Sequence, residues 1–354
     1  MSDRGHRRLV RVTFVSAYLV VLAGSVVRMT GSGMGCPDWP MCFGLAIPPT
    51  DVTQVTWAAG ASYAEGRMLV ADDTLWVATV EHVAQAASFA SERATNPDLW
   101  QPYDKHDYAV FNPLHTWVEF INRLIGAFTG LPALLLLAFS VLRAVKGRGW
   151  RPVGLSFAVV LSLGFVAWLG KKVVDGNLIP GSITIHMFGA IVILLLLAAM
   201  LTLSEIRAWG TPLDRAIGLA TGFRDRLKLW GGALLLLALG QTLFGTQVRE
   251  AVDALSHLGL ARMDWIDNLP AWWKGHGMAA WVVLLFHLPA VWRLRAVWWG
   301  RLVGAAIAGQ FLTGFLMHQF HMLAAAQPIH LILALAVVIA DGVLWLTAFR
   351  KPEV

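Results

Sequence analysis

Three histidines in long apolar stretches are the residues of this sequence best suited to chemistry. His186, His276 and His330 each lie about one helical turn inside one end of an apolar run. Two neutral imidazoles in an apolar helical bundle are the axial ligands that a low-spin haem iron takes, whereas zinc would need more N, S or O ligands. For one histidine alone, a hydrogen bond to a neighbouring group would be the simpler interpretation. For three of them in matching positions, the ligand interpretation is favoured.

A second group of reactive side chains lies in the segment 115–126. His115, Glu119, Asn122 and Arg123 recur at i, i+4, i+7 and i+8, so that a helix would carry them on one stripe. An imidazole, a carboxyl, an amide and a guanidinium then point in one direction. A Glu119–Arg123 pair can be purely structural, because each charge lowers the cost of the other. A reactive site is the alternative interpretation.

The composition shows which elements must position these residues. Of 354 residues, 57% are apolar and only 14% are charged, with a mean hydropathy of +0.60; soluble domains carry about 25% charge. Soluble, disordered, collagen-like and disulfide-rich secreted classes are therefore excluded, and two cysteines are too few for a disulfide framework. Eight stretches reach the length of about 20 residues that a membrane span requires. They are 10–29, 115–142, 152–174, 182–204, 228–248, 273–292, 301–320 and 328–349.

The basic residues predict the orientation of these spans. Cytoplasmic loops are enriched in lysine and arginine, and alternate connections hold most of them, at 1–11, 143–151, 205–228, 293–301 and 350–354. Segment 30–112 instead carries ten acidic residues against three basic ones. We therefore expect a multi-pass cell-membrane protein with both termini cytoplasmic and loop 30–112 external. The net charge of +6 reflects this topology and predicts no nucleic-acid partner.

Part of the external loop has helical spacing. Trp76, Val80, Val83 and Ala87 recur at i, i+4, i+7 and i+11, which predicts an amphipathic helix over 73–94. Such a helix would lie along the outer membrane surface or cover the bundle.

The chain repeats itself in two halves. Span 1 ends in Gly24-Ser-Val-Val-Arg28 and span 5 in Gly245-Thr-Gln-Val-Arg249, while spans 4 and 8 open with Ile-His. Asn122 in span 2 matches His276 in span 6. We therefore expect an all-α integral membrane protein whose eight transmembrane helices form two pseudo-symmetric four-helix bundles with equivalent sites. The predicted parts are a basic N-terminus 1–11, an N-terminal bundle 12–204 that includes loop 30–112, a linker 205–227, a C-terminal bundle 228–349 and a tail 350–354.

The repeat brings the candidate ligands to one depth near the external face. His276 in span 6 and His330 in span 8 can face each other across the C-terminal bundle. Arg28 and Arg249 close spans 1 and 5 at about the same level, where a guanidinium can bind haem propionates through its planar fork. Interfacial snorkelling of the two arginines is the alternative.

The halves differ in one respect. Span 6 has Trp273 in the position of Glu119 and Gly277 in the position of Arg123. A pair that served only as scaffold would have no reason to exist in one half alone. The asymmetry indicates one reactive and one auxiliary cofactor site.

Several motifs together resemble the haem A synthase family. The longest reads Arg28-Met-Thr-Gly-Ser-Gly-Met-Gly-Cys36-Pro-Asp-Trp-Pro-Met-Cys42. The resemblance continues through Glu119-x-x-Asn-Arg, through Gln241-x-x-x-Gly-Thr-Gln-Val-Arg-Glu250 and through the Ile-His openings of spans 4 and 8. It covers all eight spans and leaves only the loop from about 50 to 110 unplaced.

The resemblance implies an oxidoreductase that converts the C8 methyl of haem O to the formyl of haem A for terminal oxidases. It implies haem b in the C-terminal bundle with His276 and His330 as ligands, and the substrate haem in the N-terminal bundle with His186 as ligand. Glu119 matches the catalytic glutamate of the family. The partners implied are haem O, membrane lipid, and haem O synthase or an electron donor, with a second copy of the chain as a further candidate.

The cysteines also match the family pattern, and one residue departs from it. Cys36 and Cys42 match a pair that can form a disulfide, which an oxidising exterior permits; two free thiols are the alternative. The usual Glu-x-x-His-Arg of the family is Glu-x-x-Asn122-Arg here, and asparagine is a poor haem ligand. Either His186 holds the substrate haem alone, or His115 takes over from about 10 Å further along the helix.

Two other functions fit part of the sequence. A di-haem b-type membrane cytochrome that transfers electrons from quinol would use the same histidines and arginines, but it would not need Glu119 in one bundle only. A transporter would need broken helices and a polar site at the midplane, whereas the polar residues here gather at one outer depth.

Overall fold

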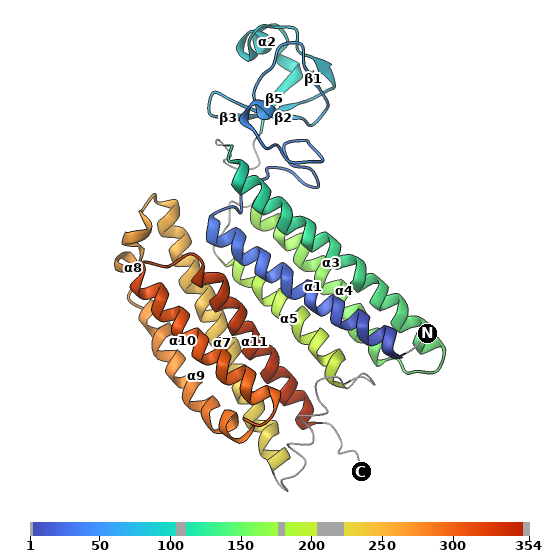
Figure 1. The fold of residues 1–354 in the computed structure, drawn as a ribbon. Coiled ribbons are helices and arrows are strands. Elements are labelled where there is room, and N and C mark those ends of the chain that lie inside the picture. The colour runs from blue at the N-terminus through green and yellow to red at the C-terminus, as the bar shows by residue number, and fades with distance from the viewer. Residues whose placement is uncertain (1–2, 104–110, 176–180, 204–222, 350–354) are drawn as a thin grey trace. The chain divides into compact units, whose positions relative to one another are not determined.

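The computed structural model describes residues 3–103, 111–175, 181–203 and 223–349, and helices dominate them (Figure 1). Among these residues, eight helices are long and apolar enough to cross a membrane, as the sequence predicts. They are α1 (Asp3–Thr30), α3 (Pro113–Val145), α4 (Arg151–Asp175), α5 (Ser182–Leu203), α7 (Phe223–His257), α9 (Trp273–Arg293), α10 (Trp298–Gln319) and α11 (Ala326–Ala348). The chain is a multi-pass membrane protein. The predicted linker 205–227 lies mostly outside the described residues, and the predicted tail 350–354 lies wholly outside them.

Glycines end two of these helices in the way that the sequence dictates. Gly31 follows α1 with a φ of 70°, and Gly259 follows α7 with a φ of 78°. The amide of Ser32 returns to the carbonyl of Val27 at 2.8 Å. A residue in the left-handed region satisfies otherwise unpaired carbonyls at a helix end, and glycine adopts it without steric cost.

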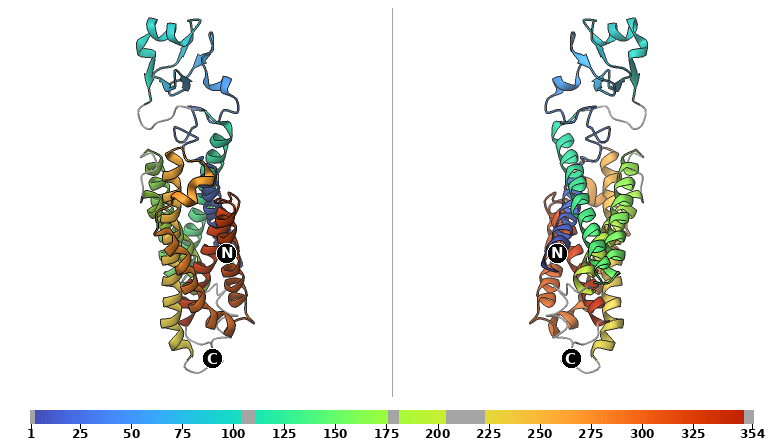
Figure 2. Two further views of the ribbon diagram at one scale, coloured as in Figure 1. Left: turned by 90° about the vertical axis from the view of Figure 1, so that its left-hand side faces the viewer. Right: turned by 90° about the vertical axis from the view of Figure 1, so that its right-hand side faces the viewer.

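The chain divides into two compact units, and the first contains most of the helices. It comprises Met1–Ser25, Gly126–Leu169 and Pro180–Val354. Within it, contacts join α7 to α9, α9 to α10, α10 to α11 and α11 back to α7. In the three views of Figures 1 and 2, these helices, coloured yellow to red, run side by side. Helices α9 and α11 therefore face each other across the interior of this group, with α5 packed against both α11 and α7.

The core of this unit consists of aliphatic side chains, with Trp299 as its largest buried residue. The indole of Trp299 donates to the carbonyl of Ala340 at 2.9 Å, which satisfies its polar atom inside the core. The division into two four-helix bundles stays a prediction, as do the boundaries assigned to them.

The second unit, Val26–Ile125 with Gly170–Ile179, contains the loop between the first two spans. Strands β2 (Met68–Ala71), β3 (Thr74–Ala78) and β5 (Trp100–Pro102) form an antiparallel sheet, in the order β2-β3-β5. Strands β1 (Ser62–Tyr63) and β4 (His82–Val83) form a second pair. The described part of the loop also contains short 3-10 turns at Val52–Val55 and Pro97–Leu99 and helix α2 (Phe89–Thr95). One of its two small cores is rich in aromatic residues and includes Tyr63, Phe89 and Trp100.

The prediction of an amphipathic helix over 73–94 is wrong. Only Phe89–Thr95 is helical, and the remainder of that range forms strands and turns. Asp72 and Asp73 have φ values of 51° and 53° and connect Ala71 to its partner Thr74. Two consecutive residues with positive φ make the tight turn of a right-twisted hairpin, a role that suits aspartate. The segment therefore forms a hairpin, although its apolar residues have helical spacing.

Candidate functional site

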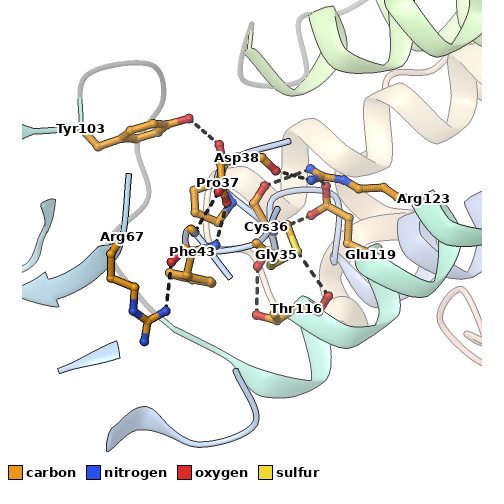
Figure 3. Close-up of a disulfide and its surroundings, with 12 residues drawn as sticks. Gly35, Cys36, Pro37, Asp38, Phe43, Arg67, Tyr103, Thr116, Glu119 and Arg123 are labelled. Carbon is orange, nitrogen blue, oxygen red and sulfur yellow. Dashed lines mark hydrogen bonds and ion pairs between the residues drawn. A yellow bond between two sulfur atoms is a disulfide. The ribbon is translucent and has the colours of Figure 1, made fainter. Parts of the chain in front are cut away.

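The first candidate site is a disulfide loop that lies on the first turns of α3 (Figure 3). Cys36 and Cys42 form the disulfide, with an S–S distance of 2.05 Å, and both residues are fully buried. The disulfide suggested by the resemblance is therefore present. Asp38 shapes the loop inside it, because its two carboxylate oxygens accept from the amides of Phe43 at 2.6 Å and Gly44 at 2.8 Å. Burial raises the pKa of Asp38, and these hydrogen bonds oppose the rise.

Glu119 and Arg123 hold this loop against α3. Glu119 is 3% exposed, and its Oε2 accepts from the backbone amide of Cys36 at 2.8 Å. Its Oε1 pairs with Nη2 of Arg123. The guanidinium also donates to the carbonyls of Cys36 at 3.0 Å and Asp38 at 2.5 Å. Figure 3 shows the carboxylate and the guanidinium turned together toward the loop backbone. The ion pair predicted from the i, i+4 spacing is confirmed.

A glycine lets the loop approach the helix so closely. Thr116 donates to the carbonyl of Gly35 at 2.9 Å. A Cβ atom on Gly35 would lie 2.3 Å from the carbonyl oxygen of His115, which is too close for any larger residue. The loop backbone therefore rests directly on α3 and brings the Cys36 amide to Glu119.

The structure separates the predicted stripe of α3 into two groups. Glu119 and Arg123 bind the loop, whereas among the described residues neither the side chain of His115 nor that of Asn122 forms a hydrogen bond with it. Oδ1 of Asn122 is buried and has no hydrogen-bond partner among the described residues. Arg28, near the end of α1, is partly buried. The roles predicted for these residues toward a cofactor stay predictions.

The second candidate site is a pair of imidazoles inside the group of α7, α9, α10 and α11. The ring centroids of His276 on α9 and His330 on α11 lie 6.3 Å apart, and their planes meet at 62°. With metal–nitrogen bonds of about 2 Å, two imidazoles bound end-on to one iron would have centroids about 6 Å apart. The predicted facing of His276 and His330 is therefore observed.

The hydroxyl of Thr313 on α10 contacts the ring of His330. This hydroxyl lies 2.8 Å from Nδ1 of His330 and donates to the carbonyl of Gly309, also at 2.8 Å. A hydroxyl has one hydrogen to donate. We assign that hydrogen to the carbonyl, which makes Nδ1 the donor in the contact with Thr313. Nε2 of His330 is then left as the basic nitrogen, which is the atom a metal would bind.

Glycine also makes room for the histidine rings. A Cβ on Gly245 of α7 would lie 3.1 Å from Cε1 of His276, closer than ordinary contact. Gln241, one turn earlier on α7, donates to the backbone carbonyl of His276 at 2.9 Å. The motif residues Gln241 and Gly245 thus hold α9 close to α7 where its histidine lies.

The donor set of this pair fits a haem better than a zinc ion. Nδ1 of His276 is buried without a hydrogen-bond partner among the described residues. A buried polar atom without a partner is unusual in proteins, and a ligand bound nearby is one explanation for it. No group of three or more metal-binding side chains occurs among the residues that the structure describes. Two imidazoles in apolar surroundings match the axial ligands of a haem iron.

Arg249 and His186 lie in the same helical unit. Arg249 pairs with Asp253 at 2.7 Å and donates to Gln327 at 2.6 Å. His186 lies in the second turn of α5 and is partly buried. Binding of propionates by Arg249 and ligation by His186 stay predictions.

The contact between His287 and Asp341 is one of the polar contacts that the sequence interpretation missed. Both residues are fully buried, and Nε2 of His287 lies 2.9 Å from Oδ2 of Asp341, 54 positions further along the chain. His276 and His330 are separated by the same 54 positions. That equal offset on the same two helices was the signal that could have revealed the pair.

The described elements define a multi-pass membrane protein with histidines inside its helices, and comparisons with known proteins give its family. The model of the COX15-CtaA family, described as "Cytochrome oxidase assembly protein", matches residues 7–72 and 78–341. The chain belongs to this family.

Two relatives carry the name "Heme A synthase". The one from Shewanella oneidensis is 26% identical over 263 residues, which are 74% of this chain and 62% of that relative. The one from Shouchella clausii is 46% identical over 46 residues, 13% of this chain and 15% of the relative. This chain therefore aligns with less than two thirds of the length of either relative.

Proposed function

We propose that this protein is a haem A synthase, an oxidoreductase that converts the C8 methyl of haem O to the formyl of haem A. Membership of the COX15-CtaA family carries the proposal, and the relatives named "Heme A synthase" support it. A di-haem quinol-oxidising cytochrome would also use facing histidines, but the comparisons do not favour it.

The C-terminal helices would hold the auxiliary haem b. His276 and His330 are the proposed axial ligands, because their rings face each other at the separation that a shared iron requires. Thr313 keeps Nε2 of His330 basic by accepting the hydrogen of Nδ1. The substrate haem is assigned to His186 on α5. When bound, the haems supply the redox chemistry that oxidation of an unactivated methyl requires.

Glu119 is the proposed catalytic residue of this chain. Oxidation of a methyl to a formyl releases protons, so a carboxylate near the reacting carbon can accept one. The structure supports a fixed position for this carboxylate, since Arg123 and the Cys36 amide both bind it. The disulfide loop would then orient Glu119 and keep water away from it.

The second axial position of the substrate haem has two candidate arrangements. Asn122 replaces the histidine of the family pattern, so His186 either acts alone or is joined by His115. Replacing His115 with alanine distinguishes them by the spectrum of the loaded protein. A low-spin signal that turns high-spin identifies His115 as a ligand, and an unchanged signal identifies His186 as the sole protein ligand.

The proposed setting of the reaction is the cell membrane, with both termini cytoplasmic and loop 30–112 external. This orientation follows from the basic residues of alternate connections. In this setting, membrane lipid surrounds the protein, and haem O synthase or an electron donor is the expected protein partner.

The test is to supply haem O to the purified membrane protein with a reductant and air, and to identify extracted pigments by mass. Formation of the formyl product is the expected result. Recovery of unchanged haem O together with haem b alone would overturn the proposal and favour the quinol-oxidising cytochrome. A His330→Ala variant treated identically controls for conversion that does not depend on the protein.

A further inference from the structure

Two adjacent residues of α7, Arg249 and Glu250, contact two different helices. Successive residues of an α-helix point about 100° apart, so neighbours in sequence face different partners. Arg249 reaches α11, and Glu250 reaches α5. Each of these helices carries one of the candidate haem ligands within its first two turns, His330 on α11 and His186 on α5.

Glu250 binds the start of α5 through both carboxylate oxygens. Oε1 accepts from the hydroxyl of Thr184 at 2.7 Å, and Oε2 accepts from the amide of Gly181 at 3.2 Å. Gln247, one turn earlier on α7, donates to the same Thr184 hydroxyl at 2.7 Å. A negative charge beside the unpaired amides of a helix N-terminus is favourable. Glu250 therefore fixes both the position and the rotation of the first turn of α5.

Arg249 makes the corresponding contact with α11. Its Nη1 donates to Oε1 of Gln327 at 2.6 Å, and Asp253 on the next turn of α7 holds its Nη2 at 2.7 Å. Nε2 of Gln327 in turn donates to the carbonyl of Met322 at 2.8 Å. The side chain of Gln327 thus connects the first turn of α11 to α7 and to the segment before α11.

We propose that Arg249 and Glu250 are positioning residues that set the two histidine-bearing helices from one helix, Glu250 acting on His186 through α5 and Arg249 acting on His330 through α11. His186 follows Thr184 by two positions, and His330 follows Gln327 by three. Less than one helical turn separates each anchored residue from its histidine. A small rotation at the anchor therefore moves the imidazole directly.

This assignment rests on the proposed function only where the histidines are called haem ligands. The anchoring itself concerns the protein without haem. The experiment is therefore hydrogen–deuterium exchange on the haem-free full-length protein, followed by electron paramagnetic resonance of the loaded protein. The variants are Glu250→Gln, Glu250→Ala and Gln327→Ala, with Asp267→Asn on the exposed surface of α8 (Trp265–Asn268) as the matched control.

The two anchors are expected to fail independently. Glu250→Ala should raise amide exchange over 182–190 by tenfold or more and leave 326–334 unchanged, and Gln327→Ala should do the reverse. Glu250→Gln keeps an acceptor oxygen and should recover part of the protection. In the loaded protein, Glu250→Ala should shift only the signal of the haem assigned to His186.

Three outcomes would overturn the assignment. Glu250→Ala could leave exchange over 182–190 within twofold of the control variant. It could raise exchange in both helices equally, which would indicate general destabilisation. It could also change the α5 exchange and leave the haem signals unaltered, which would show that the anchor does not act on His186. Failure of the unmodified protein to convert haem O is a separate result that tests the proposed function alone.

Discussion

The loop-bearing end of α3 and the facing parts of α9 and α11 are predicted from the sequence to be equivalent, yet they hold different chemistry. The first joins a carboxylate and a guanidinium to the backbone of a disulfide loop. The second joins two imidazole rings, supported by a hydroxyl and by glycines. If the predicted repeat holds, a few substitutions at equivalent positions are enough to give the two halves different side-chain chemistry.

Three positions account for most of the difference. Glu119, Asn122 and Arg123 of span 2 correspond to Trp273, His276 and Gly277 of span 6. Trp273 packs beside the ring of His318, with centroids 6.0 Å apart, and cannot bind a loop amide as a carboxylate does. We therefore expect the C-terminal site to tolerate changes in the loop, and the α3 site to depend on them.

The largest effect is expected from His330→Ala. Loss of an axial ligand should remove haem b or make it high-spin, because only His276 of the facing pair would then remain. The measurement is the absorbance spectrum and the haem content per protein after purification from haem-replete cells. His318→Ala, at the exposed end of α10, should keep the normal spectrum. A normal low-spin spectrum in His330→Ala would show that the pair is not the haem b site.

Glu119→Gln should lower haem O conversion by about 10²- to 10⁴-fold, the usual contribution of a general acid or base. The change removes the charge and keeps the size, so haem b content should stay normal. Conversion is followed by the mass of extracted pigments. Glu65→Gln, in an exposed part of the loop, is the matched control. Full conversion by Glu119→Gln would show that Glu119 only holds the disulfide loop against α3.

Thr313→Val tests the support of the C-terminal pair. Loss of a group that orients a metal-bound histidine typically costs about 10- to 100-fold in affinity, so haem b should dissociate faster by that factor. Thr313→Ser keeps the hydroxyl and should restore retention. The rate is measured by transfer of haem to apomyoglobin. Equal rates in the valine and serine variants would contradict the assigned tautomer of His330.

The smallest effect is expected from replacing both Cys36 and Cys42 with serine. A disulfide that closes so short a loop contributes about 2 kcal/mol through the entropy of the unfolded chain. Local amide exchange around residues 36–44 should rise accordingly, while the spectrum of haem b stays the same. A changed haem b spectrum would show that the two regions are not independent.

Local properties of the chain could be predicted well from the sequence. The eight spans follow from the length of apolar chain that a bilayer requires, and the pair of Glu119 and Arg123 follows from helical spacing. The facing of His276 and His330 could be predicted because the repeat placed both at one depth.

Other contacts between distant segments could not be predicted in this way. The amide that binds Glu119 belongs to Cys36, 83 positions earlier in the chain, and only the closed loop brings it there. The sheet of the loop depends on the turn at Asp72 and Asp73, whose positive φ values do not show in hydrophobic spacing. The contact of Glu250 with α5 likewise depends on how two spans pack.

The buried contact between His287 and Asp341 restricts how this part of the gene can change in length. Eleven residues separate the two cross-bundle contacts on each helix, from 276 to 287 on α9 and from 330 to 341 on α11. One residue inserted between them on a single helix would rotate one contact by about 100° and displace it by about 1.5 Å, so that only one of the two could form. We therefore expect insertions and deletions in this interval to be retained only when α9 and α11 change by the same number of residues.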